Sequence, residues 1–160
     1  MIMRQTGAMR ITARVDYAVR AMTVLACATD DRPVKAEAVA EDQGIPLQFL
    51  LKILAELRLA RLVTSRRGQQ GGFALARPAD DITVADVIRA VEGPLADVHG
   101  APPEELAYVG SATALREVWI ATRLALRDVL EEVSIAHIAS GVLPDAIGAQ
   151  LTRPGADRRR

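Results

Sequence analysis

A run rich in arginine and glycine carries the side chains that are best suited to bind an anion: Arg66-Arg67-Gly68-Gln69-Gln70-Gly71-Gly72. Glycines keep a turn flexible enough for an arginine to enter a narrow groove, and they leave backbone N–H groups free to meet phosphate oxygens. The run lacks the Gly-Lys-Ser/Thr ending of a P-loop and the strand-to-helix setting of a dinucleotide fold, which argues against a mononucleotide. It is an ordinary hairpin tip unless a DNA-binding element precedes it.

A helix beginning at Pro46 is such an element, because proline suits the first helical turn. A helix with its side chains is about 10–12 Å wide and fits the major groove of DNA, where its N-terminal residues meet the base edges. Gln48 can pair with adenine and Lys52 with guanine or a phosphate, while Phe49 or Leu51 can touch a thymine methyl group. The alternative is a solvated helix face and, for Phe49 and Leu51, ordinary core.

Hydrophobic spacing predicts the elements that position these residues. A first helix follows the N-cap Thr12 and ends near Thr29, a second covers Lys35 to Asp42, and the third ends near Leu59. Two short strands then form a β-hairpin around the glycine-rich turn, Val63–Arg67 and Phe73–Ala76. Three helices and a hairpin, in this order, predict a winged helix-turn-helix domain in a mainly α fold.

Three residues have the spacing of a tight helix-turn-helix. Ala40 lets the second and third helices approach, Gly44 permits a positive φ in the turn, and Leu50 anchors the third helix in the core. The triplet is a weak signal in an alanine-rich chain, and the hairpin that follows strengthens it.

The second half of the chain predicts a long helix that needs a partner. A capping box of Thr83 and Asp86 begins a helix ending at Glu92. The loop of residues 93–110 follows, and from the N-cap Ser111 to about Val133 apolar residues recur four and three apart, as in a helix–helix seam. Ile120 and Leu124 lie on the other face, either as isolated surface residues or because a second protomer covers them. The residues assigned to dimerisation are Leu115, Trp119, Ile120, Leu124, Leu126 and Val129.

The predicted organisation ends in short elements. Short helices over Ser134–Ser140 and after Pro144 close the fold. The expected parts are an N-terminal extension, the winged helix-turn-helix domain, a loop, the dimerisation region and a disordered tail, over residues 1–8, 9–92, 93–110, 111–151 and 152–160.

The overall composition predicts a soluble, cytoplasmic domain. The net charge is zero, but residues 1–80 carry 12 basic and 8 acidic side chains whereas residues 81–160 carry 8 and 12. A basic first half suits a polyanionic partner. No uninterrupted apolar stretch approaches a membrane span of roughly 18 residues, and the first residues contain no apolar signal core. An enzyme is the weakest interpretation, because His99 and His137 have no nearby nucleophile or metal spacing.

The motifs together resemble the Rrf-type winged-helix transcriptional regulators, the family of IscR, NsrR and CymR. The resemblance covers the chain from Met9 to about Gly141. It is carried by Met9-Arg10-Ile11-Thr12, Asp16-Tyr17-Ala18-Val19-Arg20-Ala21-Met22, Gly44-Ile45-Pro46, Leu62-Val63, Ser65, Arg67-Gly68, Gly71-Gly72-Phe73, Leu75, Ile82-Thr83-Val84-Ala85-Asp86-Val87-Ile88 and Val91-Glu92-Gly93.

This resemblance implies a homodimer that binds double-stranded DNA at a near-palindromic operator. The third helix would then lie in the major groove and Arg67 in the minor groove, while Thr12, Arg14 and Tyr17 would approach the DNA backbone. The sequence departs from the cluster-binding members, which place three cysteines in the loop before the long helix. Residues 93–110 contain none, so a cysteine-ligated iron–sulfur cluster is excluded and no cofactor is expected.

Two unusual sensing chemistries remain as alternatives. One is a cluster ligated by Asp16, His99 and Cys27. The other is redox sensing by Cys27, although an inert, partly buried thiol is the better interpretation. The sequence therefore predicts a dimeric regulator, a repressor in preference to an activator, that responds to a small molecule or a partner protein. A winged-helix protein-interaction module controlled by a partner protein is the alternative.

Overall fold

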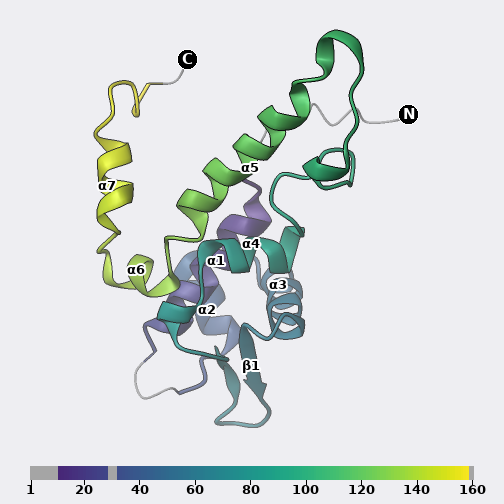
Figure 1. The fold of residues 1–160 in the computed structure, drawn as a ribbon. Coiled ribbons are helices and arrows are strands. Elements are labelled where there is room, and N and C mark those ends of the chain that lie inside the picture. The colour runs from purple at the N-terminus through teal and green to yellow at the C-terminus, as the bar shows by residue number, and fades with distance from the viewer. Residues whose placement is uncertain (1–10, 29–31, 159–160) are drawn as a thin grey trace.

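The chain folds into a winged-helix unit from which one long helix projects (Figure 1). The computed structural model describes residues 11–28 and 32–158. The winged-helix unit contains α1 (Ala13–Ala26), α2 (Ala36–Gln43), α3 (Leu47–Leu59), β1 (Val63–Arg66), β2 (Gly72–Leu75) and α4 (Val84–Glu92). The long helix α5 (Leu115–Leu130) leads to α6 (Ile135–Ser140) and α7 (Asp145–Leu151). The predicted mainly α fold with a β-hairpin wing and a long C-terminal helix is confirmed.

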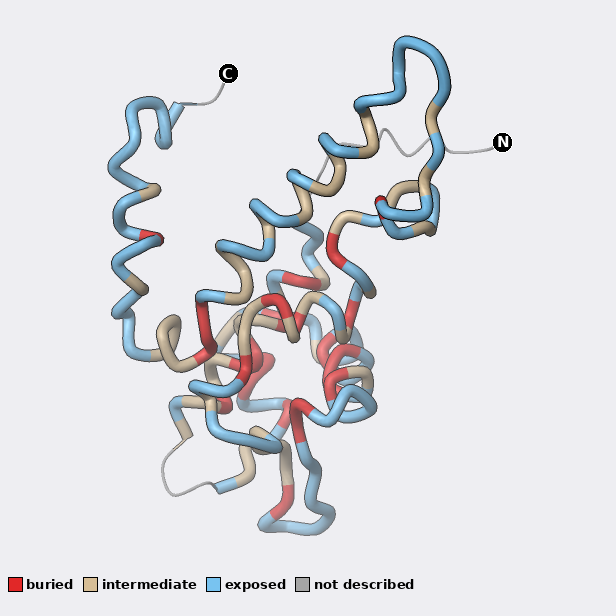
Figure 2. Tube along the Cα trace, viewed as in Figure 1, coloured by how far each residue is buried: buried red, intermediate tan, exposed pale blue. Residues whose placement is uncertain are grey.

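The hydrophobic core lies within the winged-helix unit (Figure 2). Met22 of α1 and Leu50, Leu54 and Leu57 of α3 are completely buried there. Burying a side chain of this size contributes about 1.5–3 kcal/mol to folding. Helix α5, by contrast, contains no buried residue, although it is amphipathic. Its apolar residues therefore contribute little to the stability of a single protomer.

The wing includes a third, minimal strand that the sequence did not indicate. Val34 forms an antiparallel bridge with Phe73, with N···O distances of 2.7 and 2.8 Å in the two directions. Gly72 lies against this bridge at φ 149°, and a Cβ atom there would be 2.5 Å from the carbonyl oxygen of Val34. Gly72 is thus required by the close approach of two backbones.

We expect Gly72→Ala to lower the free energy of unfolding by about 1–3 kcal/mol, because the added methyl group forces two backbone segments apart. The urea midpoint measures this change. Gly148→Ala is the matched control: Gly148 lies in α7 with open space at its Cβ position, and alanine there should raise stability by about 0.5–1 kcal/mol. Equal midpoints for Gly72→Ala and the wild type would contradict the close approach.

The boundaries of α5 differ from the prediction at both ends. The helix begins at Leu115 rather than after Ser111, which lies in the short 3₁₀ turn Gly110–Ala112. The backbone N–H and the hydroxyl of Thr113 both donate to the carbonyl oxygen of Gly110, and these bonds hold the turn in place of a Ser111 cap. At the other end α5 stops at Leu130, so Val133 does not belong to its seam.

The chain returns to the winged-helix unit directly after α5. Val133 is buried, and its carbonyl oxygen accepts a hydrogen bond of 2.9 Å from the backbone N–H of Val84. Ile135 is completely buried, and its N–H donates to the carbonyl oxygen of Ile82. Helix α6 consequently packs against α1 and anchors the base of α5 to the winged-helix unit.

The observed ends of the other elements differ from the predicted ends by small amounts. Lys35 is the N-cap of α2 and lies outside the helix. Helix α1 ends at Ala26, and Thr29 lies outside the described residues, as does the predicted extension over residues 1–8. The second strand of the hairpin, β2, begins and ends one residue earlier than predicted, at Gly72 and Leu75 instead of Phe73 and Ala76. After α7 the chain follows exposed turns as far as Arg158, in a segment for which the sequence predicts disorder.

Candidate nucleic-acid interface

Helix α3 turns its N-terminal residues away from the core. Leu50, Ile53, Leu54 and Leu57 face inward and are buried. The side chains predicted to meet DNA are all exposed, namely Pro46, Gln48, Phe49, Leu51 and Lys52. Phe49 and Leu51 retain 44% and 38% of their accessible surface, so the alternative that they are ordinary core is wrong. Gly44 holds the turn before the helix at φ 62°, as predicted.

An aromatic contact joins α1 to the start of α3. The rings of Tyr17 and Phe49 meet edge to face, 5.8 Å apart at an angle of 85°. The guanidinium of Arg20 lies 5.5 Å from the Tyr17 ring and donates through Nε to Oε1 of Gln43 at 3.1 Å. Arg20 and Gln43 were not predicted as interface residues, although the i,i+4 pair of Asp16 and Arg20 is legible in the sequence. These contacts hold α1 against the end of α2 and the start of α3.

Two of the predicted backbone-contacting residues are already engaged within the protein. Thr12 caps α1 by accepting from the N–H of Val15, and its hydroxyl donates to Oε1 of Glu92 at 2.7 Å. Arg14 forms an ion pair with Glu56 of α3, and this hydrogen bond raises the pKa of Arg14. Their contact with DNA stays a prediction.

The wing presents a row of polar and basic side chains to solvent. Its tip turns at Gly68, where φ is 101°, and the N–H of Gly71 donates to the carbonyl oxygen of Gly68 at 3.0 Å. All five wing residues predicted to bind DNA are exposed, and they are Arg66, Arg67, Gly68, Gln69 and Gln70. A Cβ atom at Gly71 would lie 2.3 Å from the carbonyl oxygen of Arg66, so the tip requires glycine there too.

A basic groove lies between the wing and the start of α2. It has a volume of about 590 Å³ and is lined by Arg32, Lys35 and Arg66 together with Gln69 and Gln70, and among the described residues no acidic side chain lines it. Sequence reasoning missed Arg32 and Lys35, because nothing local in the sequence places residues 32–35 beside the wing.

Acidic neighbours neutralise seven of the arginines that the structure describes. Arg14, Arg20, Arg77, Arg89, Arg116, Arg123 and Arg127 form ion pairs with acidic residues. Within the described parts of the chain, no ion pair engages the basic side chains of the wing, its groove or the exposed face of α3: Arg32, Lys35, Lys52, Arg66 and Arg67. These five side chains leave positive charge available to a phosphate backbone, and Arg58, Arg61, Arg153 and Arg158 likewise form no ion pair within the described residues.

The long helix carries the residues predicted for dimerisation. Leu124 is 49% exposed, and the other five are half-buried, namely Leu115, Trp119, Ile120, Leu126 and Val129. Trp119 donates through its ring N–H to the hydroxyl of Tyr108 in the preceding loop, at 3.1 Å. Their part in an interface between protomers stays a prediction.

Comparison with known proteins decides the family. Residues 11–141 match the Rrf2 family, described as iron-dependent transcriptional regulators. The chain belongs to the Rrf2 family. It is 48% identical over 159 residues to Rv1287 of Mycobacterium tuberculosis, a candidate HTH-type transcriptional regulator, with 94% of this chain and 98% of that protein covered. It is 33% identical over 132 residues to the HTH-type transcriptional regulator CymR of Bacillus subtilis, with coverages of 82% and 91%.

Solved structures agree with this assignment. The structure of B. subtilis CymR, described as the global cysteine regulator, has a TM-score of 0.71 at 30% identity and covers 84% of this chain and 98% of that one. T. potens IscR has a TM-score of 0.67 at 32% identity, with coverages of 91% and 94%. The Rrf2 chain is a DNA-binding transcriptional regulator and not an enzyme, as predicted.

The family description names iron, which proteins hold in iron–sulfur clusters through cysteine thiolates. The loop of residues 93–110 in this Rrf2 chain has no cysteine, and its candidate donors are Asp97, His99, Glu104 and Glu105. Over residues 11–28 and 32–158, no three His, Cys, Asp or Glu side chains lie close enough together to hold a metal ion. The donors therefore do not fit a cluster held by thiolates.

The unusual ligand set is likewise not assembled in one protomer. Asp16, His99 and Cys27 form no such group among the described residues, and Asp16 pairs with Arg20. Cys27 is exposed at the C-cap of α1, so the expectation that it is partly buried is wrong. In the described part of the chain, no helix is long and apolar enough to span a membrane.

Glu104 fastens the loop to α5. Its carboxylate accepts both terminal N–H groups of Arg123, one at 2.7 Å, and its carbonyl oxygen accepts from Arg116. The hydrogen bond from Arg123 is the main reason that the pKa of Glu104 falls from 4.5 to about 2.

A titration of the Glu104 carboxyl carbon by NMR should therefore give a pKa of about 2. Because the folded pKa is depressed, the stabilising contact is complete above pH 4.5 and is lost as the pH falls through about 2. In Arg123→Gln the pKa should return towards 4.5, whereas Arg58→Gln, the same charge change on α3, should leave it low. A low pKa in Arg123→Gln would show that Arg123 is not its cause.

Proposed function

We propose that this Rrf2 chain is a homodimeric, sequence-specific repressor that acts in the cytoplasm without a cysteine-ligated iron–sulfur cluster. Each protomer reads one half of a near-palindromic operator, with α3 in the major groove and Arg67 of the wing in the minor groove.

The observation that carries this proposal is the position of the uncompensated positive charge. Lys35 lines the groove beside the wing, Arg67 is exposed on the wing itself, and Lys52 and Gln48 are exposed on α3. Phosphate contacts set the position of a protein on DNA, and side chains that reach the base edges set the sequence. These residues supply both kinds of group, two of them on a helix that fits the major groove.

The helix α5 supports the dimer. It is amphipathic, has no buried residue and exposes Val118 and Leu124. A second copy of α5 is the natural cover for such a face, since closed two-fold symmetry is the commonest arrangement of oligomers. A dimer bound over a promoter excludes polymerase from the DNA that it covers, which is why we propose repression.

The absence of cysteine from residues 93–110 supports independence from a cluster. Thiolates are the ligands that iron–sulfur clusters require in most proteins. We therefore infer that the signal is a small molecule or a partner protein.

Operator binding tests the proposal directly. The purified protein is titrated onto labelled DNA from upstream of its own gene, by fluorescence anisotropy at two salt concentrations, and its visible absorption spectrum is recorded from the same sample. We expect specific binding that weakens steeply with salt, no visible absorption, and reduced transcript in a reconstituted transcription assay. A coloured sample would overturn the cluster-free proposal, and colourless protein without specific binding would favour the protein-interaction module.

A further inference from the structure

A cavity of about 510 Å³ lies where the C-terminal end of α4, the following loop and α5 meet. Its volume falls in the usual range for sites of small ligands. Arg89 comes from α4, Glu104 from the loop, and Arg123 and Arg127 from α5. A ligand here would therefore touch both the DNA-reading unit and the long helix.

Guanidinium groups supply the hydrogen-bond donors of the cavity. Arg89, Arg123 and Arg127 line it together with the carboxylates of Asp97 and Glu104, and a third carboxylate outside the lining, that of Glu131, pairs with Arg89 and Arg127. Both carboxylate oxygens of Glu104 already accept hydrogen bonds from Arg123. Arg127 donates only its Nε to a protein acceptor among the described residues, Glu131 at 3.1 Å, which leaves its two terminal nitrogens for a ligand.

A buried donor without a partner lies at the same place. The Nε of Arg123 is inaccessible to solvent and has no hydrogen-bond acceptor within the described residues, and the Arg123 side chain is only 19% exposed. Buried polar groups in proteins are nearly always hydrogen-bonded, so an acceptor is expected nearby.

The remaining walls are apolar. Leu95 is buried at the edge of the cavity, and three prolines stiffen the loop around it, Pro94, Pro102 and Pro103. A rigid apolar wall opposite a fork of guanidinium donors matches a molecule with one carboxylate and a hydrocarbon body.

We propose that this cavity binds a small monocarboxylate with an apolar ring or chain, and that this binding weakens the hold of the protein on its operator. The regulatory half of the proposal rests on the proposed DNA-binding function.

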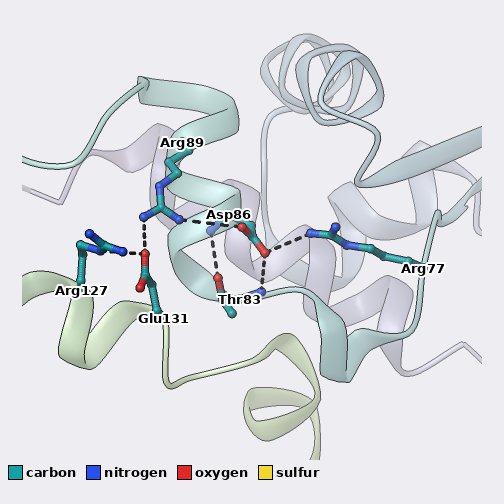
Figure 3. Close-up of polar contacts among 6 residues, drawn as sticks. All are labelled: Arg77, Thr83, Asp86, Arg89, Arg127 and Glu131. Atoms are coloured by element: carbon teal, nitrogen blue, oxygen red, sulfur yellow. Dashed lines mark hydrogen bonds and ion pairs between the residues drawn. The ribbon is translucent and has the colours of Figure 1, made fainter.

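A chain of ion pairs links the cavity to the wing (Figure 3). Glu131 at the end of α5 pairs with Arg127 and with Arg89 of α4, and Arg89 also approaches Asp86 at 3.9 Å. Asp86 in turn pairs at 3.0 Å with Arg77, which lies just beyond β2. Figure 3 places Arg89 between Asp86 and Glu131. A ligand carboxylate that engages Arg89 and Arg127 competes with Glu131 and loosens the attachment of α5 to the winged-helix unit.

The test uses the full chain and simple probes. Benzoate, phenylacetate and hexanoate are titrated into the protein by calorimetry, with benzamide as the uncharged match for benzoate. Trp119 gives a second readout, because it is the only tryptophan and lies one helical turn before Arg123. We expect at least one carboxylate to bind and to change the Trp119 fluorescence, and benzamide not to bind.

Two variants locate the site. Arg127→Gln should weaken carboxylate binding about tenfold, the usual cost of losing a hydrogen bond to a charged group. Arg153→Gln, in the exposed turn after α7, should bind as the wild type does. No binding of any of the three carboxylates, equal binding of benzamide, or unchanged affinity in Arg127→Gln would overturn the proposal.

Operator affinity separates this inference from the function on which it rests. It is measured on the same samples with and without the binding carboxylate, and we expect the ligand to lower it. A wild-type protein that binds its operator equally well with ligand present would refute the regulatory link while leaving DNA binding intact. A protein that binds the carboxylate but no operator would refute the repressor and keep the ligand site.

Discussion

Arg67→Ala is expected to lower the affinity for the operator about tenfold to a hundredfold, which corresponds to the roughly 1–3 kcal/mol of a specific arginine contact. Arg67 lies exposed at the wing tip and has no ion-pair partner among the described residues. Its charge is therefore fully available to DNA. Because the substitution removes no contact of the core, the unfolding midpoint should stay at the wild-type value.

The salt dependence distinguishes a DNA contact from indirect damage. Each neutralised phosphate contributes roughly −0.9 to the slope of log affinity against log salt, so loss of one charge per protomer should flatten the slope by about two units in a dimer. Arg153→Ala is the matched control, since Arg153 is exposed in the turn after α7, away from the wing. A slope that is identical in Arg67→Ala and the wild type would remove Arg67 from the interface.

Local signals in the sequence predicted several elements of the fold. The capping box of Thr83 and Asp86 is present as predicted, because both partners lie within one turn of helix. Gly44 adopts its positive φ because the turn between α2 and α3 requires it. In each case the interaction that decides the structure involves residues that are close in the sequence.

Contacts between distant segments account for what was not predicted. The bridge of Val34 with Phe73 joins residues that are far apart in the sequence, and Arg32 and Lys35 flank it beside the wing. Ser111 is as good a capping residue as Thr83, yet the hydrogen bonds of Thr113 to Gly110 favour a 3₁₀ turn. The spacing of apolar residues predicted that α5 extends to Val133. This spacing does not indicate where the chain leaves the helix and folds back onto the start of α4.

The same division applies to the charges. The composition shows that the first half of the chain is basic, but it does not show which arginines there are neutralised by acidic neighbours. Arg14 and Arg67 look alike in the sequence, and only the fold places Glu56 against Arg14, while no described carboxylate forms an ion pair with Arg67. The candidate DNA surface is thus defined as much by the absence of acidic neighbours as by its basic residues.

Leu124→Glu should convert the dimer to monomers and reduce operator affinity by about two to four orders of magnitude, the gain usually obtained by linking two binding units. Leu124 is 49% exposed in one protomer, so a charge there leaves the protomer fold intact. In the dimer the same charge would be buried without a partner, which costs far more than the lost apolar contact. Sedimentation velocity measures the oligomeric state, and anisotropy with the operator measures the affinity.

Binding to an isolated half-site separates loss of the dimer from damage to the DNA-reading surface. The affinity of Leu124→Glu for a single half-site should equal the affinity of a wild-type protomer, because Leu124 belongs to α5 and not to α3 or the wing. Leu59→Glu introduces the same charge at an 81% exposed leucine at the end of α3, and it should remain dimeric. A monomeric Leu124→Glu that keeps full operator affinity would refute recognition by two linked protomers, since two half-sites one helical turn apart can be held together only by a joined pair of domains.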